Sequence, residues 1–196
     1  MALPSSSLSP LTGDIIIDGL THGYYWELDA TRKVNWAISD GWSWEFWTDP
    51  LATIANLDLA FSTFEYYANI NFEYEGYFNN PGTAYLGGSD ITISIDGAGA
   101  IFDSTSTWAL GVFPDSSYDA LYLGAPGDIY VNINSAANFL PSYDPGSAGY
   151  FLALHEIGHT LGLKHPHDDG GTGSPTFQNL GSTLHELNSK SWVRVD

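Results

Sequence analysis

The stretch that organises this chain is HEIGHTLGLKHP, residues 155–166. Two histidines four positions apart on a helix lie on one face, one turn above the other, so His155 and His159 can point into the same cleft. Gly162 suits a left-handed residue that ends the helix and reverses the chain, which could return His165 to that cleft. The spacing therefore predicts a helix followed by a turn that gathers three imidazoles.

Three neutral imidazoles leave the charge of Zn²⁺ uncompensated and its fourth position open to water, as in catalytic rather than structural zinc sites. Such an ion lowers the pKa of its water to about 7. Glu156 lies about 100° round the helix from His155, beside the metal rather than on it, where it can move a proton from that water to a leaving amine. Because five specified positions coincide in H-E-x-x-H-x-x-G-x-x-H, we interpret His155, His159 and His165 as zinc ligands and Glu156 as the general base, rather than as ordinary surface or core residues.

The motif resembles the metzincin zinc signature, and its wording is most similar to secreted bacterial metalloproteases of the serralysin type. TGDIIIDGLTHGYYW (residues 12–26) and GDIYVNINSAANF (residues 127–139) also resemble that family's catalytic domain. The resemblance covers about residues 12–166, strongly at the helix and weakly elsewhere. It implies an α+β fold with a mixed, twisted sheet and two long helices, the second carrying the zinc motif. It also implies a zinc-dependent endopeptidase acting on protein or peptide substrates, with a Glu-activated zinc-bound water.

One part of the family pattern is missing. Metzincins carry a methionine turn beneath the metal, and serralysin-type members add a tyrosine there, yet the only methionine of this chain is Met1. No such turn occurs in residues 166–196. Two alternatives therefore stay open: a catalytically silent zinc-binding or interaction module, and, less favoured, a zinc hydrolase acting on a non-peptide bond.

The composition narrows the classes of partner. A chain of 196 residues with 43% hydrophobic and 15% aromatic residues favours one packed globular domain. The formal net charge of −18 argues against nucleic acid or an anionic membrane as partner. No apolar run is long enough to span a membrane, and the absence of cysteine excludes thiolate ligands. We expect a monomer.

The chain divides into three expected segments: a flexible lead-in rich in serine and proline (residues 1–13), an upper catalytic lobe (14–166) and the start of a truncated lower lobe (167–196). The lead-in lacks the basic and apolar regions of a Sec-type signal. The C-terminal export signal and the glycine-rich calcium repeats of serralysin-type proteins are also missing. We therefore expect a fragment of a longer, secreted protein.

Two Asp-Pro pairs predict the starts of the long helices. Asp49 suits the N-cap and Pro50 the first helical position, and an apolar stripe predicts that this helix runs over about 50–68. Asp144-Pro145 is predicted to open the helix that carries the zinc motif. The core-facing stripe of this second helix is predicted to be Tyr150, Leu154, Ile157 and Leu161.

Alternating or β-rich segments predict strands at 34–38, 70–74, 90–95, 107–113 and 128–133. In metzincins a substrate peptide adds itself to an edge strand that precedes the active-site helix. The resemblance assigns that substrate-binding role to Trp108, Ala109, Leu110, Gly111, Val112 and Phe113. An ordinary edge strand is the equally weighted alternative.

Three further features have two interpretations each. An aromatic cluster is interpreted as buried packing beneath the first long helix, with sugar stacking as the alternative; its members are Trp42, Trp44, Phe46 and Trp47. His22 is interpreted as a solvent-facing or hydrogen-bonded residue rather than a ligand, and His167 and His185 lack motif spacing. Asp168 and Asp169 could hold Ca²⁺ through oxygen ligands, but a solvated acidic loop is favoured because a complete calcium-loop spacing is missing.

Overall fold

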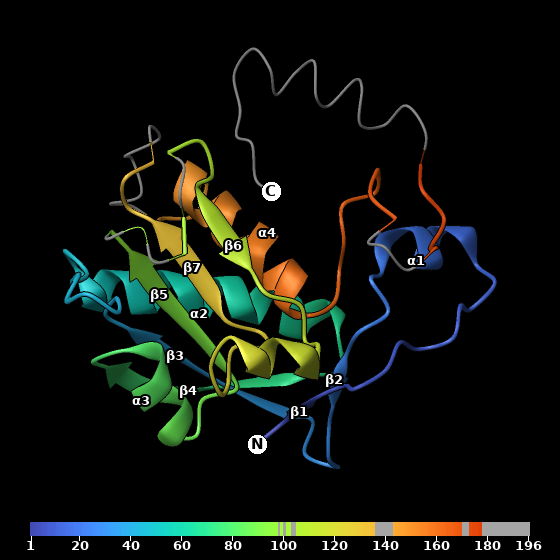
Figure 1. Cartoon of the computed structure of the whole chain (residues 1–196), viewed down its shortest axis with the longest axis horizontal. Helices are drawn as coiled ribbons and strands as arrows, with labels where there is room; N and C mark the ends of the chain where they lie inside the picture. Colours follow the sequence, from blue (N-terminus) through green and yellow to red (C-terminus); the bar gives the residue numbers. More distant parts are fainter. Residues whose placement is uncertain (98, 100, 103–104, 136–142, 170–172, 178–196) are drawn as a thin grey trace.

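The computed structural model describes residues 1–97, 99, 101–102, 105–135, 143–169 and 173–177 (Figure 1). Its helices are α1 (Ile15–Leu20), α2 (Pro50–Tyr67), α3 (Pro81–Leu86), the 3₁₀ helix η1 (Ser116–Ala120) and α4 (Ala148–Thr160). Its strands are β1 (Leu3–Pro4), β2 (Trp26–Glu27), β3 (Lys33–Ser39), β4 (Asn71–Phe78), β5 (Ile91–Asp96), β6 (Ala109–Gly111) and β7 (Ile129–Asn132). Within these residues the chain is an α+β protein, which is the class predicted from the sequence.

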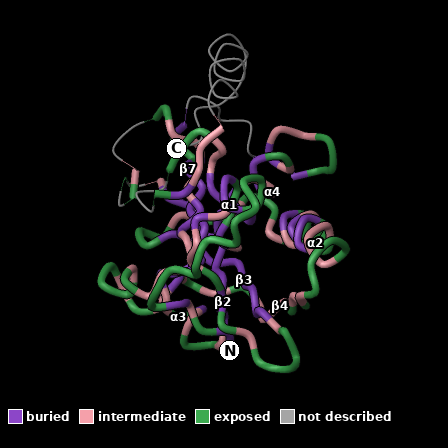
Figure 2. Tube along the Cα trace, turned by 90° about the vertical axis from the view of Figure 1, so that its right-hand side faces the viewer, coloured by how far each residue is buried: buried purple, intermediate pink, exposed green. Residues whose placement is uncertain are grey.

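Five of the described strands form one mixed sheet in the order β4-β3-β5-β7-β6. The first four run parallel, and β6 pairs antiparallel with β7 at the edge of the sheet. β5 and β7 are buried along their whole length, as is β3 after Lys33. Continuous burial is expected of parallel strands that are covered on both faces. Figure 2 shows the buried residues gathered along these central strands, with exposed residues on the surrounding loops.

Helix α2 begins and ends as the sequence predicts. The Asp49 carboxylate accepts a hydrogen bond from the backbone N–H of Ala52, and Pro50 occupies the first turn. α2 packs against β4 and α4, and α4 packs against β6 and β7. Phe61 of α2 contacts the buried Trp36 of β3, with ring centroids 4.7 Å apart. Neither α2 nor any other helix in the described part of the chain is long and apolar enough to cross a membrane.

The predicted start of α4 at Asp144-Pro145 is wrong. The helix begins at Ala148, and the Ser147 side chain caps it by accepting from the N–H of Tyr150. Gly146 has a φ of +88°, so Asp144 to Gly146 form a turn that cannot continue into a right-handed helix. The Ser147 N–H closes this turn by donating to the Asp144 carbonyl.

Strand β6 lies at the sheet edge, as predicted, but it is shorter than the predicted 107–113. Only Ala109–Gly111 pairs with β7, which is itself four residues long. Beyond this pairing, the N–H of Val112 donates to the carbonyl of Asp128, and the chain then leaves the sheet. The short partner strand therefore limits the length of β6.

The first residues of the chain pack against the rest of the protein. Leu3–Pro4 forms strand β1 with β2, and the Ser5 N–H donates to the carbonyls of Tyr25 and Pro114. Ala2 and Ser5 are buried. The expectation of a flexible lead-in over residues 1–13 therefore does not fit Ala2 to Ser5, which are paired with or packed against other segments, although Met1 and Leu3 are exposed.

The aromatic cluster predicted to be buried is mostly exposed. Trp42, Trp44 and Phe46 are 42%, 79% and 64% exposed, and only Trp47 packs against the core. The loop that carries them closes on itself, because the Glu45 carboxylate accepts from the backbone N–H groups of Ser43 and Gly97. This closure turns the first three aromatic side chains outward, so the prediction of core packing is wrong for them.

Candidate metal centre

The end of α4 turns as the motif predicts. Gly162 has a φ of +91°, and the Leu163 N–H donates to the Gly158 carbonyl across the reversal. A Cβ at position 162 would lie 2.3 Å from the carbonyl oxygen of Tyr24. Glycine is therefore required here both by the left-handed backbone and by the neighbouring chain.

This turn brings the three predicted histidines together. The Nε2 atoms of His155 and His159 lie 3.0 Å apart, those of His155 and His165 lie 3.0 Å apart, and those of His159 and His165 lie 3.2 Å apart. Their ligand atoms form one group within 4.8 Å of one another, close enough to hold a metal ion. In a tetrahedral zinc site with Zn–N bonds of about 2.0–2.1 Å, ligand nitrogens lie about 3.4 Å apart. The three imidazoles therefore fit the spacing that a small divalent cation requires.

Hydrogen bonding sets the tautomer of His159. Its Nδ1 lies 2.7 Å from the carbonyl oxygen of Leu163, which can only accept a hydrogen bond. Nδ1 therefore carries the proton, and the lone pair of Nε2 faces the other two histidines. The turn after α4 thus also orients one of the ligands.

The environment keeps the imidazoles of His155 and His159 neutral. Burial, reinforced by His159 and His165, lowers the pKa of His155 to about 3. Burial also lowers the pKa of His159. Neutral imidazole is the form that binds a metal, so no proton has to leave these two rings at neutral pH.

Glu156 lies beside the histidine group rather than in it. Its side chain is completely buried, and its carboxylate is not a member of the group of ligand atoms. Burial raises the pKa of Glu156 to about 8, and the nearby backbone amide of Gly111 opposes this shift. Neither carboxylate oxygen has a hydrogen-bond partner among the described residues. A buried acid with a pKa near neutrality can both take up and release a proton.

Strand β6 lies directly against α4 at Glu156. A Cβ at Gly111 would lie 2.5 Å from the Glu156 carbonyl oxygen and 3.1 Å from its Oε2. Of the predicted substrate-binding segment, Ala109, Gly111 and Val112 are buried, whereas Trp108, Leu110 and Phe113 are half-buried. The Phe113 ring meets that of His159 edge to face at 5.5 Å. The structure therefore places this segment beside the histidines.

His22 lies next to this segment but is not a member of the ligand group. Its ring stacks on the ring of Phe113, with centroids 3.9 Å apart, and its backbone N–H donates to the carbonyl of Gly162. His22 is buried, so the solvent-facing alternative is wrong because the Phe113 ring covers it.

The acidic loop after the motif has a different character. Asp168 and Asp169 are exposed, and neither belongs to a group of three possible metal ligands among the described residues. His167 stacks on His165, with ring centroids 5.4 Å apart, but it does not join the ligand group. His185 and the rest of 178–196 lie outside the described residues.

Two buried residues near the metal centre, Tyr143 and Lys164, were not predicted from the sequence. Tyr143 is buried, and burial together with Glu156 raises the pKa of its hydroxyl. Lys164 is buried inside the motif itself. A signal for Lys164 was available, because the chain has only five lysines and arginines and one of them stands between two motif positions.

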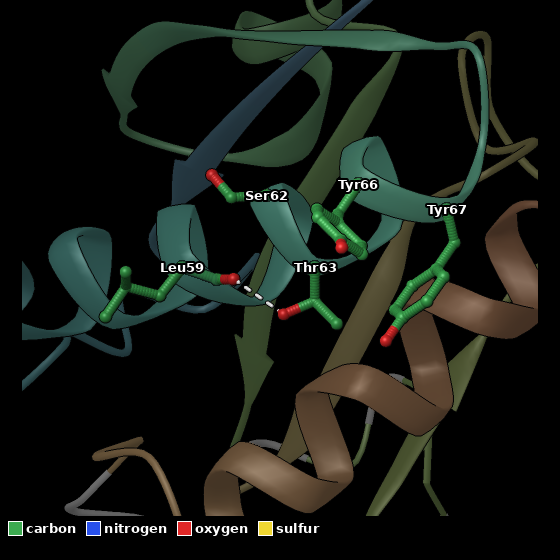
Figure 3. A pocket seen from close by; sticks show the side chains of 5 residues that line it. All are labelled: Leu59, Ser62, Thr63, Tyr66 and Tyr67. Carbon is green, nitrogen blue, oxygen red and sulfur yellow. Dashed lines mark hydrogen bonds between the residues drawn. The ribbon is translucent and has the colours of Figure 1, made fainter.

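A hollow of about 330 Å³ also occurs on α2 (Figure 3). It is lined by Leu59, Ser62, Thr63, Tyr66 and Tyr67. The Thr63 hydroxyl donates to the Leu59 carbonyl within the helix, and both tyrosines are exposed. This hollow contains no acid, base or metal ligand that would make it a second reaction centre.

Comparison with known proteins adds no assignment. No protein-family model matches the chain, and no curated protein is similar to it. A function must therefore be argued from the geometry of the histidine group and its neighbours.

Proposed function

We propose that this protein is a zinc-dependent endopeptidase that resembles metzincins of the serralysin type. His155, His159 and His165 would hold the zinc ion, and Glu156 would be the general base. The observation that carries the proposal is the convergence of three Nε2 atoms within 3.2 Å, with a buried carboxylate at the next position of the same helix. Three histidines with an open fourth position are typical of catalytic zinc.

The division of labour follows from the chemistry of each group. Zinc, when bound, supplies a Lewis acid for the attack on a peptide carbonyl. Glu156 accepts a proton from the attacking water and returns it to the leaving amine nitrogen. The position of its buried carboxylate, directly after His155 on α4, supports this role. The Nδ1–H of His159 stays bonded to Leu163 throughout, so that ring keeps its orientation.

The position of β6 at the edge of the sheet is an argument for a peptide substrate. Strand β6 has β7 on one side and ends the strand order of the described sheet. An extended peptide can add itself to such an edge through main-chain hydrogen bonds. We assign this role to Trp108–Phe113, because the segment ends at Phe113, whose ring contacts His159.

The second candidate is a zinc-binding module without catalysis. Its basis is that no methionine occurs among residues 2–196, whereas metzincins carry a methionine turn beneath the metal. Both candidates require zinc at the same three histidines. They differ only in whether a peptide bond is hydrolysed at that zinc with Glu156 as the general base.

Metal content and casein cleavage, measured on one preparation, separate the two candidates. The endopeptidase hypothesis predicts about one zinc per chain, cleavage that a chelator abolishes, and a Glu156→Gln variant that keeps the zinc but does not cleave casein. Glu73→Gln is the matched control, because Glu73 lies on β4 at the opposite edge of the sheet. Zinc binding without cleavage by the wild type would favour the silent module. Absence of zinc from the purified and zinc-supplemented protein would contradict both.

A further inference from the structure

Lys164 is buried although it carries a charge. It stands directly before His165 and is 4% exposed. Its Nζ donates to the carbonyl oxygens of Gly19 at 2.9 Å, Asp168 at 2.6 Å and Pro175 at 3.2 Å. An ammonium group has three N–H donors, so these three acceptors satisfy it completely. Burying an ammonium group costs free energy unless its N–H donors are hydrogen-bonded, and here all three are.

The three carbonyls come from three separate segments of the chain. Gly19 belongs to the last turn of α1, where carbonyl groups lack a partner within the helix. α1 has no basic residue of its own in that turn, and a cation is favourable there. Lys164 supplies this cation from 145 positions away. The same ammonium therefore joins α1, the loop after His165 and the segment that contains Pro175.

Backbone hydrogen bonds reinforce the junction on both sides of His165. The N–H of Lys164 donates to the carbonyl of Leu20, and the N–H of Phe177 donates to the carbonyl of Pro166. Thr21 and Leu163 form an antiparallel bridge. The residues directly before and directly after His165 are therefore both tied to other segments.

α1 has further contacts beside the one with Lys164. The Asp18 carboxylate accepts from the N–H and hydroxyl of Thr12 and from the N–H of Gly13. A Cβ at Gly19 would lie 2.7 Å from the Phe177 ring, so α1 and the segment after Pro175 are in close contact. These contacts give a role to residues 12–20, which the catalytic proposal leaves without one.

His165 needs such support more than the other two histidines do. His155 and His159 are fixed by the regular hydrogen bonding of α4, whereas His165 lies on the irregular turn that follows. A ligand on a turn keeps its position only if its supporting contacts hold the turn in place. The contacts of the Lys164 Nζ with Gly19 and Pro175 reach from that turn to two other segments, and its contact with Asp168 lies within the loop that follows His165.

We propose that Lys164 is a positioning residue of the metal centre: its ammonium binds α1, the metal turn and the segment at Pro175 together and thereby fixes His165 among the three ligands. The proposal rests on the zinc site proposed above. The ammonium of Lys164 holds the backbone of this loop at Asp168. Asp168 is one of the two residues that were considered from the sequence as possible calcium ligands.

The test is a double-mutant cycle on zinc affinity, measured by competition with a chromophoric chelator. Lys164→Met keeps the length and apolar stem of the side chain but removes the ammonium. We expect it to weaken zinc binding by about 10- to 100-fold, the usual effect of losing a group that orients a ligand. Lys33→Met is the charge-matched control, because Lys33 lies on β3 in a surface ion pair with Glu73, and it should bind zinc as the wild type does.

The second arm of the cycle separates positioning from a general loss of stability. In the His165→Ala background there is no third imidazole to position, so adding Lys164→Met should change zinc affinity by less than twofold. The visible spectrum of bound Co²⁺ should also differ between Lys164→Met and the wild type, and should stay unchanged in Lys33→Met. If Lys164→Met does not fold by circular dichroism, Lys164→Arg takes its place, because a planar guanidinium keeps the charge but directs its N–H donors differently from an ammonium.

Three results would overturn the proposal. The first is a Lys164 variant that binds zinc as tightly as a zinc-binding wild type. The second is an equal loss of affinity with and without His165, and the third is an unchanged Co²⁺ spectrum. Each leaves the zinc site itself standing. Failure of the wild type to bind zinc would instead contradict the proposed function.

Discussion

At the residue scale, two glycines of the metal centre differ in the space around them. Gly111 of β6 has no room for a side chain, because a Cβ there would lie 2.5 Å from the carbonyl oxygen of Glu156. Gly158 of α4 does have room, since the nearest atom to its Cβ position is a Leu163 methyl at 3.6 Å. The close approach of β6 and α4 therefore depends on one glycine only, and that glycine faces the proposed general base.

Alanine at these two positions should have opposite effects. Gly111→Ala forces β6 away from Glu156 and should lower the free energy of unfolding by roughly 1–3 kcal/mol, the usual cost of overpacking. Gly158→Ala should raise it by about 1 kcal/mol, because alanine is the better helix former. Urea denaturation of the metal-free variants measures both changes. A Gly111→Ala protein as stable as the wild type would show that β6 and α4 do not approach as described.

At the element scale, a buried carboxyl group joins two strands near the site. Asp128 directly precedes β7, and its Oδ1 accepts from the backbone N–H of Thr92 in β5 at 2.7 Å. Its Oδ2 accepts from the Tyr122 hydroxyl at 2.5 Å. Burial raises the pKa of Asp128 well above its usual range. The folded protein therefore holds a proton that the unfolded chain releases.

This shift gives the stability of the protein a pH dependence of known sign. Where the folded state binds more protons than the unfolded state, stability falls as the pH rises. The contribution of Asp128 should be complete below about pH 4, the pKa of a free aspartate, and should be lost as the pH rises towards the folded-state pKa. Asp128→Asn keeps an oxygen that accepts from the Thr92 N–H and gains an amide N–H that can donate to the Tyr122 oxygen, without an ionisable group. Its advantage over the wild type should therefore grow between pH 5 and pH 8. Chemical denaturation at the two pH values measures this difference.

The control for this prediction is Asp58→Asn on the exposed face of α2. Its stability relative to the wild type should be the same at pH 5 and pH 8. If the Asp128→Asn and Asp58→Asn proteins respond to pH in the same way, Asp128 does not contribute the predicted proton.

At the scale of the whole molecule, signals confined to a few neighbouring residues predicted structure well. The Asp49-Pro50 start gives α2, and the i, i+4 histidines with a glycine-ended helix give the cluster of three imidazoles. Both depend on interactions between residues within about one helical turn of each other, and such residues are close together in the sequence. The five strands of the main sheet were also found, because β3, β5 and β7 are buried on both faces and are therefore rich in apolar residues, whereas the short strands β1 and β2 were not predicted.

Features that depend on distant contacts were not predictable in the same way. The wrong prediction at Asp144-Pro145 has a local cause instead: the pair resembles a helix start, but the adjacent Gly146 makes it a turn. Trp44 was expected in the core, yet the hydrogen bonds of Glu45 turn its loop outward. The partners of Lys164 lie up to 145 positions away, so its burial could not be derived from local pattern.

The central claim is that three imidazoles, one of them from the turn after α4, bind a single zinc ion. X-ray absorption at the zinc edge of the zinc-loaded protein tests this most directly. The account predicts three histidine nitrogens at about 2.0 Å from zinc in the wild type and two in His165→Ala. A wild-type spectrum with two or fewer imidazoles, unchanged by the loss of His165, would contradict it.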